Sequence, residues 1–159
     1  MTSTARIRER FLDFRRRLYG AHDLTAVDDH LHPEFSSHSG NVRPRLEAAR
    51  QAALAADVPR VDLRPAYKAF VKTFHVGVPD LRPVSQELVV EDAGLMAMTL
   101  WEATHTGVFF GVPATGKALH FATADRYRLQ DGLLVEHWDV VDALDAWVTL
   151  GIVARRAGA

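Results

Sequence analysis

The sequence contains no cysteine. This absence excludes disulfide bonds, thiolate nucleophiles and metal sites with cysteine ligands. Long apolar runs are also missing, because the apolar stretch at residues 94–101 is far shorter than the roughly 20 residues that span a bilayer. Residues 1–8 carry charged side chains and no apolar core, so they do not look like a secretion signal. We therefore expect a cytoplasmic protein without contact to membranes.

An excess of charge of either sign is absent as well. The chain has 19 basic and 20 acidic residues and a net charge of −1. It therefore offers no overall electrostatic attraction to nucleic acid. Arginines are dense between residues 6 and 17 and could form a local basic patch, but apolar residues recur every three or four positions from Ile7 to Leu18. That pattern predicts an amphipathic helix with a solvated arginine face, and no nucleic-acid partner.

The length of 159 residues fits a single domain spanning the whole chain, 1–159. The first half has helical patterns and the second half has strand patterns separated by turn signals such as Asp131-Gly132. Helices followed by a meander of strands predict an α+β fold, with the N-terminal helices packed in the concave face of a strongly curved, mainly antiparallel sheet. The expected helices cover residues 3–19, 24–31, 44–56, 65–75 and 143–150, and the expected strands 82–91, 95–106, 117–129 and 133–142.

Two segments resemble a known family. Residues 104–117 read THTGVFFGVPATGK, and residues 131–142 read DGLLVEHWDVVD. Both are similar to segments of the SnoaL-like polyketide cyclases, whose fold is the cone-shaped α+β barrel shared with ketosteroid isomerase and nuclear transport factor. The resemblance covers nearly the whole chain except residues 41–63, which we interpret as a helical insertion. It implies a small-molecule substrate with an apolar body, such as a polycyclic one, no cofactor, and a homodimer or homotetramer formed through the sheet.

Asp139 is the first candidate catalytic residue. It lies in an apolar strand between Trp138 and Val140, where burial would raise the pKa of a carboxyl group toward the range useful for acid/base catalysis. In the family that this chain resembles, the aspartate at this position is the general acid/base. The alternative is that Asp139 only pairs near the end of its strand, a role that fits Asp142 better.

Asp125 is a second candidate, on the preceding strand of the same hairpin. Counting through the turn at residues 131–132 places it roughly opposite Asp139. The cyclases commonly carry a histidine at this position, so aspartate is a departure from the family pattern. Two carboxyl groups facing inward would have pKa values driven apart and could share a proton. Alternatively, Asp125 pairs with Arg126, Arg128 or a nearby histidine.

Three histidines are further candidates. Strand alternation places His137 on the same face as Asp139, where it could act with the aspartate in catalysis. His105, on another predicted strand, could polarise a substrate carbonyl, and His38 matches a pocket-lining position of the family. The spacing of the histidines fits no metal motif, so we expect no metal site.

Aromatic side chains complete the predicted substrate pocket. The residues expected to line or support it, besides the two histidines, are Phe35, Trp101, Phe121 and Tyr19. Together these features predict a cofactor-independent acid/base enzyme, most simply one that closes a ring by an aldol reaction. An isomerase or a dehydratase could use the same pocket, and a non-catalytic binding or assembly module is a different alternative.

Overall fold

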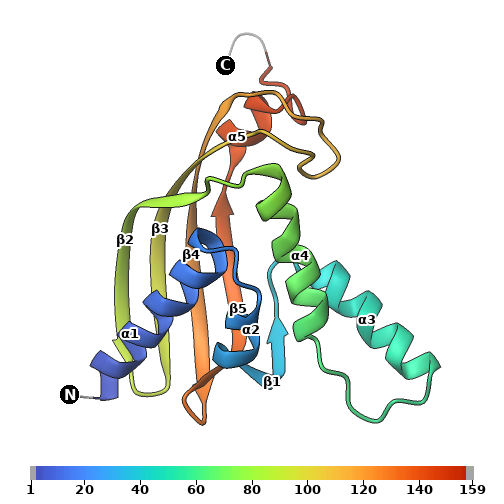
Figure 1. The fold of residues 1–159 in the computed structure, drawn as a ribbon, viewed down its shortest axis with the longest axis vertical. Coiled ribbons are helices and arrows are strands. Elements are labelled where there is room, and N and C mark those ends of the chain that lie inside the picture. Colours follow the sequence, from blue (N-terminus) through green and yellow to red (C-terminus); the bar gives the residue numbers. More distant parts are fainter. Residues whose placement is uncertain (1–2, 157–159) are drawn as a thin grey trace.

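The computed structural model describes residues 3–156 and shows one curved sheet with helices on its concave side (Figure 1). The sheet has five strands in the order β1-β5-β4-β3-β2. Its four antiparallel strands follow one another in the chain, and β1 joins the edge of β5 in parallel. The strands are β1 (Leu31–Ser37), β2 (Arg82–Glu91), β3 (Gly94–Thr104), β4 (Ala118–Gln130) and β5 (Leu133–Asp142).

The helices belong mainly to the first half of the chain, as predicted. Helix α1 leads directly into η1, a π-helical turn, and α4 lies beside the parallel edge of the sheet (Figure 1). The predicted α+β fold with a curved, mainly antiparallel sheet is confirmed. The helices are α1 (Ser3–Arg15), η1 (Arg16–Gly20), α2 (Thr25–His30), α3 (Arg43–Ala55), α4 (Arg64–Gly77) and α5 (Leu144–Thr149).

Strand β1 is an element that the sequence pattern did not predict. The segment Leu31–Ser37 contains Pro33, and its buried and exposed residues do not alternate regularly. Only part of the segment pairs with β5. Leu31 pairs with Leu134 and Ser37 with His137, with an irregular register between them. This strand carries Ser37 next to the centre of β5, which matters for the site described below.

The helix expected within residues 41–63 is α3. Only Leu46 is buried among its residues, and Figure 1 shows α3 beside α4 and away from the middle of the sheet. Leu46 nevertheless joins the main hydrophobic core, together with Val42 just before the helix. That residues 41–63 are an insertion stays a prediction, as does the single-domain boundary at 1–159.

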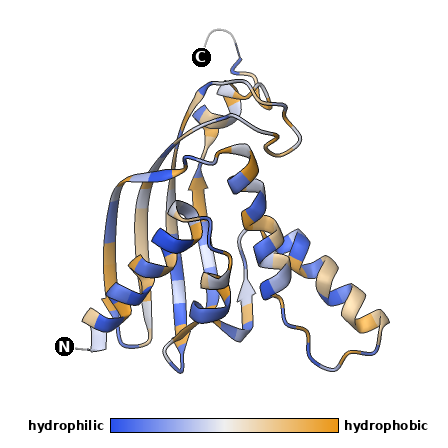
Figure 2. Cartoon of the chain, in the orientation of Figure 1, coloured by the Kyte–Doolittle hydropathy of each residue, from blue (hydrophilic) through white to orange (hydrophobic). Residues whose placement is uncertain are grey.

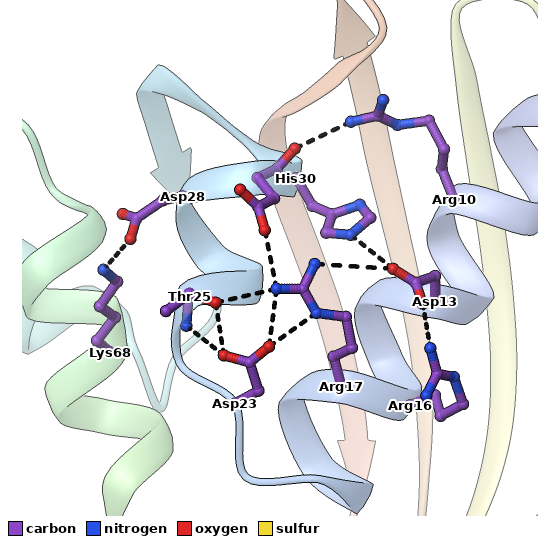
Figure 3. A network of polar contacts seen from close by, with 10 residues as sticks. Arg10, Asp13, Arg16, Arg17, Asp23, Thr25, Asp28, His30 and Lys68 are labelled. Atoms are coloured by element: carbon purple, nitrogen blue, oxygen red, sulfur yellow. Dashed lines mark hydrogen bonds and ion pairs between the residues drawn. The ribbon is translucent and has the colours of Figure 1, made fainter.

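A polar network fixes the bend between α1 and α2 (Figure 3). Arg17, in η1, contacts three carboxylates, those of Asp13, Asp23 and Asp29. The side chain of Asp23 also accepts hydrogen bonds from the backbone N–H and the hydroxyl group of Thr25, the first residue of α2. Arg16 and Arg17 are thus partners of neighbouring acids, and their contacts tie the π-helical turn to α1 and α2.

The core lies between α1, α2, α4 and the concave face of the sheet. Figure 2 shows hydrophobic and hydrophilic residues intermixed along α1 and the strands, as expected for elements with one buried side. A second apolar cluster, which includes Leu81, Trp101 and Phe109, closes the end of the sheet near α5. Within residues 3–156 no helix is long and apolar enough to cross a membrane. The cytoplasmic location stays a prediction.

Candidate active site

The centre of the site is a pair of aspartates on adjacent strands. Asp125 on β4 lies directly opposite Asp139 on β5, as the sequence predicted. The turn at Asp131-Gly132 has two residues with positive φ, as in a type I′ hairpin, and by itself this turn would place Asp125 opposite Trp138. Between Arg128 and Leu129 the register shifts by one residue, so that Asp125 pairs with Asp139 instead and Asp139 faces inward.

Asp125 is held as a carboxylate. Only 4% of its surface is exposed, and its Oδ2 accepts hydrogen bonds from Arg15 at 3.3 Å and from the Thr123 hydroxyl at 2.8 Å. Its Oδ1 lies 3.1 Å from His137 Nε2. Burial by itself would raise the pKa of Asp125, but the Arg15 charge and the hydrogen bonds outweigh burial and lower the pKa to about 2. Asp125 is therefore ionised at any ordinary pH.

Arg15, at the end of α1, is a site residue that the sequence did not reveal. It is 7% exposed, and its guanidinium group donates to Thr99 at 3.2 Å as well as to Asp125. The guanidinium carbon lies 4.7 Å from the centre of the Trp101 ring, a cation–π distance. Arg15 therefore neutralises the buried charge of Asp125 while packing among aromatic rings.

His137 is occupied on both ring nitrogens. Nε2 faces Asp125, and Nδ1 lies 2.9 Å from the hydroxyl oxygen of Ser37. Because ionised Asp125 only accepts hydrogen bonds, the proton belongs on Nε2, and Ser37 donates to Nδ1. The ring also stacks on Tyr127 with 4.5 Å between centroids. His137 thus belongs to the framework of the site, and neither nitrogen is free for a substrate.

Asp139 has a different environment from Asp125. It is partly buried, and its Oδ2 accepts one hydrogen bond, from the hydroxyl of Ser39 at 2.8 Å. Burial raises the pKa of Asp139, and the nearby negative charge of Asp125 acts in the same direction, while Ser39 and His137 oppose the shift. The net direction is upward, so the pKa values of the two aspartates are moved apart.

A pocket of about 60 Å³ opens beside these residues. Arg15, Asp125, His137 and Asp139 all line it. The volume is well below the roughly 300–1,000 Å³ of most ligand pockets, because aromatic side chains fill much of the cone. The aromatic lining consists of Tyr19, Tyr67, Phe70, Phe74, Trp101, Phe121 and Tyr127.

Comparison with known families identifies the fold. The sequence profile described as SnoaL-like polyketide cyclase matches residues 9–147. The chain belongs to the SnoaL-like polyketide cyclase family. Among curated protein sequences, none matches this SnoaL-like chain at a significant level.

Solved structures with the same fold come from several bacteria. AclR from Streptomyces galilaeus, a proposed hydroxylase, is 23% identical with a TM-score of 0.72, covering 94% of this chain and 98% of AclR. A proposed polyketide cyclase from Acidithiobacillus ferrooxidans is 24% identical with a TM-score of 0.73, covering 97% of this chain and 100% of that protein. A SnoaL-like polyketide cyclase from Agrobacterium tumefaciens is 17% identical with a TM-score of 0.64, covering 89% and 97%. At these identities the likeness shows the SnoaL-like cone, and not its reaction.

The structure brings together six of the nine site residues expected from this SnoaL-like sequence. Asp139, His137, Asp125, Trp101, Phe121 and Tyr19 all line the pocket. Trp101 stacks near Phe121, with ring centroids 6.2 Å apart, and meets Tyr19 edge to face at 5.4 Å. The Trp101 indole N–H donates to Thr123, which orients the ring. The π-helical turn of η1 is what carries Tyr19 to this position.

Three expected substrate-binding residues lie outside the pocket. His38 follows β1 on the other face of the sheet, where its ring stacks on Trp138 and contacts Glu136 at 2.8 Å. Phe35 is fully buried against Tyr67 in the core, one layer behind the pocket. His105 is buried near α5, where its Nδ1 lies 2.9 Å from the hydroxyl of Thr115. The neighbour of His38, Ser39, points inward in its place.

The SnoaL-like site also contains a group of side chains spaced as metal ligands could be. Oxygen or nitrogen atoms of Asp125, His137 and Asp139 lie within 4.8 Å of one another. However, Arg15 already donates to Asp125, and His137 has a partner on each nitrogen. A cation would have to displace these bonds next to a guanidinium charge, so the donor set does not fit a metal ion.

Proposed function

We propose that this SnoaL-like protein is a cofactor-independent acid/base enzyme that acts on a carbonyl compound, with Asp139 as the general acid/base. The observation that carries the proposal is the contrast between the two opposed aspartates. Asp125 is fixed as a carboxylate by Arg15, whereas Asp139 faces the pocket with a raised pKa and a single hydrogen-bond donor. A group that must take up and return a proton needs the environment of Asp139.

An aldol cyclisation uses this arrangement in three steps. The Asp139 carboxylate removes a proton from the carbon next to a substrate carbonyl, which leaves an enolate. The enolate carbon then attacks a second carbonyl of the same molecule, so that a carbon–carbon bond forms and an alkoxide results. Protonated Asp139 returns its proton to the alkoxide. The enzyme ends as it began, and no electron acceptor is required.

The pocket lining favours a neutral, flat substrate. The rings of Tyr19, Trp101 and Phe121 offer faces and edges for stacking. The guanidinium of Arg15 is the cation that lines this pocket, and Asp125 already neutralises it. A substrate with a polycyclic body enters only when the aromatic side chains move apart, because the pocket holds about 60 Å³.

Proton removal can be tested without knowledge of the natural substrate. The protein is incubated in D₂O with 2-tetralone, an apolar bicyclic ketone, and deuterium uptake next to the carbonyl is followed by NMR. We expect exchange above the uncatalysed rate, and a loss of about 100-fold or more in Asp139→Asn. Asp142→Asn is the matched control, because Asp142 lies on the same strand but is exposed. Equal exchange by wild type and Asp139→Asn would contradict the proposal.

The same geometry serves an isomerase or a dehydratase, since both reactions also begin with removal of a proton next to a carbonyl. The products distinguish these reactions, because an aldol cyclisation forms a ring, an isomerisation moves a double bond and a dehydration releases water. The remaining alternative is a non-catalytic binding or assembly module, and the small volume of the pocket is the feature that supports it. That alternative expects no deuterium exchange above the uncatalysed rate in the presence of the wild-type protein.

We also propose that two copies associate through the outer face of the sheet. Apolar side chains on this face are exposed: Met98 on β3 is 58% exposed and Val140 on β5 is 74% exposed. Met98 and Val140 both pair across to Ala124, so they form a continuous apolar band over three strands. Sedimentation equilibrium should give a dimer or tetramer, and Met98→Glu should give a monomer. A monomeric wild-type protein would contradict this assignment.

A further inference from the structure

The structure contains a hydrogen-bonded chain that ends on Asp139, and it begins at Arg15. From Arg15 the chain runs through Asp125, His137 and Ser37 to Ser39. We propose that Ser39 is the positioning residue of Asp139, and that His137 and Ser37 hold Ser39 in place. This inference rests on the proposed role of Asp139 as general acid/base and adds the groups that prepare it for that role.

Ser39 is fixed at a junction of the backbone. It is 0% exposed, and its carbonyl group accepts hydrogen bonds from the backbone N–H groups of Val42 and Arg43, where the chain turns into α3. Its hydroxyl oxygen lies 3.4 Å from the backbone N–H of Asn41. The hydroxyl proton is therefore directed away from this turn and toward Asp139 Oδ2, at 2.8 Å.

The hydrogen bond from Ser39 distinguishes the two oxygens of Asp139. Among residues 3–156 no other side chain donates to this carboxyl group. Oδ2 is thus engaged, and Oδ1 remains available to take a proton from a bound substrate. A carboxyl group anchored on one oxygen cannot rotate freely, which keeps the reactive oxygen in one direction.

His137 and Ser37 support Ser39 from behind. His137 carries its proton on Nε2, so the Ser37 hydroxyl donates to Nδ1 and its oxygen is left to accept from the Ser39 backbone N–H at 3.2 Å. This last link is a backbone amide, which does not exchange protons readily. The chain therefore orients groups and does not conduct a proton away from Asp139.

Other titratable groups near Asp139 come from four elements, β4, β5, η1 and α1. Asp125 and His137 act directly on the pKa of Asp139. Burial raises the pKa of Tyr19 and Tyr127, and the charge of Asp139 acts in the same direction on both. Arg15, from α1, acts through Asp125. Removal of the Ser39 hydroxyl changes none of these charges, so a change in the titration of Asp139 reports on this hydrogen bond.

The test is a carboxyl-carbon NMR titration of Asp139 in protein labelled with ¹³C-aspartate, with Asp139→Asn used to assign the signal. The Ser39 hydroxyl stabilises the carboxylate, so Ser39→Ala should raise the pKa of Asp139 by about one unit. Ser36→Ala is the matched control, because it removes a serine hydroxyl on the same segment that takes no part in the hydrogen bonds leading to Asp139. It should leave the titration of Asp139 unchanged. An unchanged titration in Ser39→Ala would overturn the inference.

A second variant covers the case in which Ser39→Ala does not fold. Ser37→Ala removes the acceptor of the Ser39 N–H but leaves the Ser39 hydroxyl and the Asp139 carboxyl group in place. It should also raise the pKa of Asp139, by a smaller amount than Ser39→Ala does. An unchanged pKa would show that the hydrogen bonds of Ser37 do not support Ser39. The titration needs no substrate. Absence of catalysis would therefore remove the proposed function, whereas an unchanged titration would remove the role of Ser39.

Discussion

Asp125 and Asp139 are direct cross-strand neighbours, and their pKa values are shifted in opposite directions. The difference arises from what each carboxyl group contacts. Asp125 has a buried arginine, a threonine and a histidine as partners, and Asp139 has one serine. A single hairpin thus presents a carboxyl group with a lowered pKa beside one with a raised pKa.

The buried ion pair should dominate the response of stability to mutation. Arg15→Met leaves Asp125 buried without its cation, and we expect the free energy of unfolding to fall by about 3–5 kcal/mol. Denaturant titration measures this loss. Arg16→Met is the control, because Arg16 is the exposed neighbour of Arg15, and it should change stability by about 0.5 kcal/mol or less.

The double variant Arg15→Met/Asp125→Leu separates pairing from packing. If the loss in Arg15→Met comes from the unpaired carboxylate, removal of both charges should restore much of the stability. A double variant as unstable as the sum of the two single variants would contradict a paired role.

Asp125 should also govern stability in acid. Its folded pKa of about 2 lies below the ordinary value of 3.8. Its contribution is therefore complete above about pH 4 and is lost as the pH falls through 2, and it amounts to about 2 kcal/mol. Urea unfolding between pH 2 and 6 should show this slope in the wild type and a flatter profile in Asp125→Asn. Parallel profiles would contradict the assignment.

Asp139 should have the opposite linkage. A folded pKa above the ordinary value means that the folded state disfavours the carboxylate, so stability falls as the pH rises through that pKa. Asp139→Asn removes the ionisation and keeps an oxygen for the Ser39 hydroxyl. We expect its Tm at pH 7 to equal or exceed that of the wild type, as is common where function requires a strained group. A Tm lower by several degrees would show that the carboxylate is stabilising.

A stacked pair of histidines should add a second pH dependence. The rings of His22 and His75 lie 4.2 Å apart, and their Nε2 atoms contact the carbonyl oxygens of Pro79 and Leu18. Burial lowers the pKa of His75, and the charge of His22 acts the same way. The folded state thus favours neutral His75, so stability should decline as the pH falls below about 6.5.

Substitution of His75 isolates this effect. His75→Gln can still donate to Leu18 but cannot titrate, so its Tm should vary less between pH 5 and 7.5 than that of the wild type. His120→Gln is the control, because His120 is exposed on the outer face of the sheet. A wild-type pH dependence in His75→Gln would contradict this account.

The sequence was most informative where the physical signal was local. Strand alternation and turn residues predicted β2 to β5 nearly to their bounds, and they placed His137 and Asp139 on one face. The opposition of Asp125 and Asp139 depended additionally on a one-residue bulge in β5, which no turn signal reveals. Strand β1 was missed because it pairs in parallel over few residues.

The site residues that could not be predicted from the sequence are those that act through contacts between distant parts of the chain. Arg15 belongs to a run of arginines, and only the packing of α1 on the sheet separates it from its exposed neighbours. Ser39 follows His38, and the face that each presents is set by the start of α3. His137 was expected to be catalytic from its place beside Asp139, but its two hydrogen-bond partners assign it a supporting position.

Proton exchange between Asp139 and a bound carbonyl compound can be measured directly. Its most direct test compares two pH profiles of the wild-type protein, the rate of deuterium uptake by 2-tetralone and the carboxyl-carbon NMR signal of Asp139. We expect the rate to rise with pH through the same midpoint at which Asp139 ionises, and we expect Asp139→Asn to lose this rise. A rate that rises through a different midpoint, or that persists in Asp139→Asn, would show that Asp139 is not the group that takes up the proton.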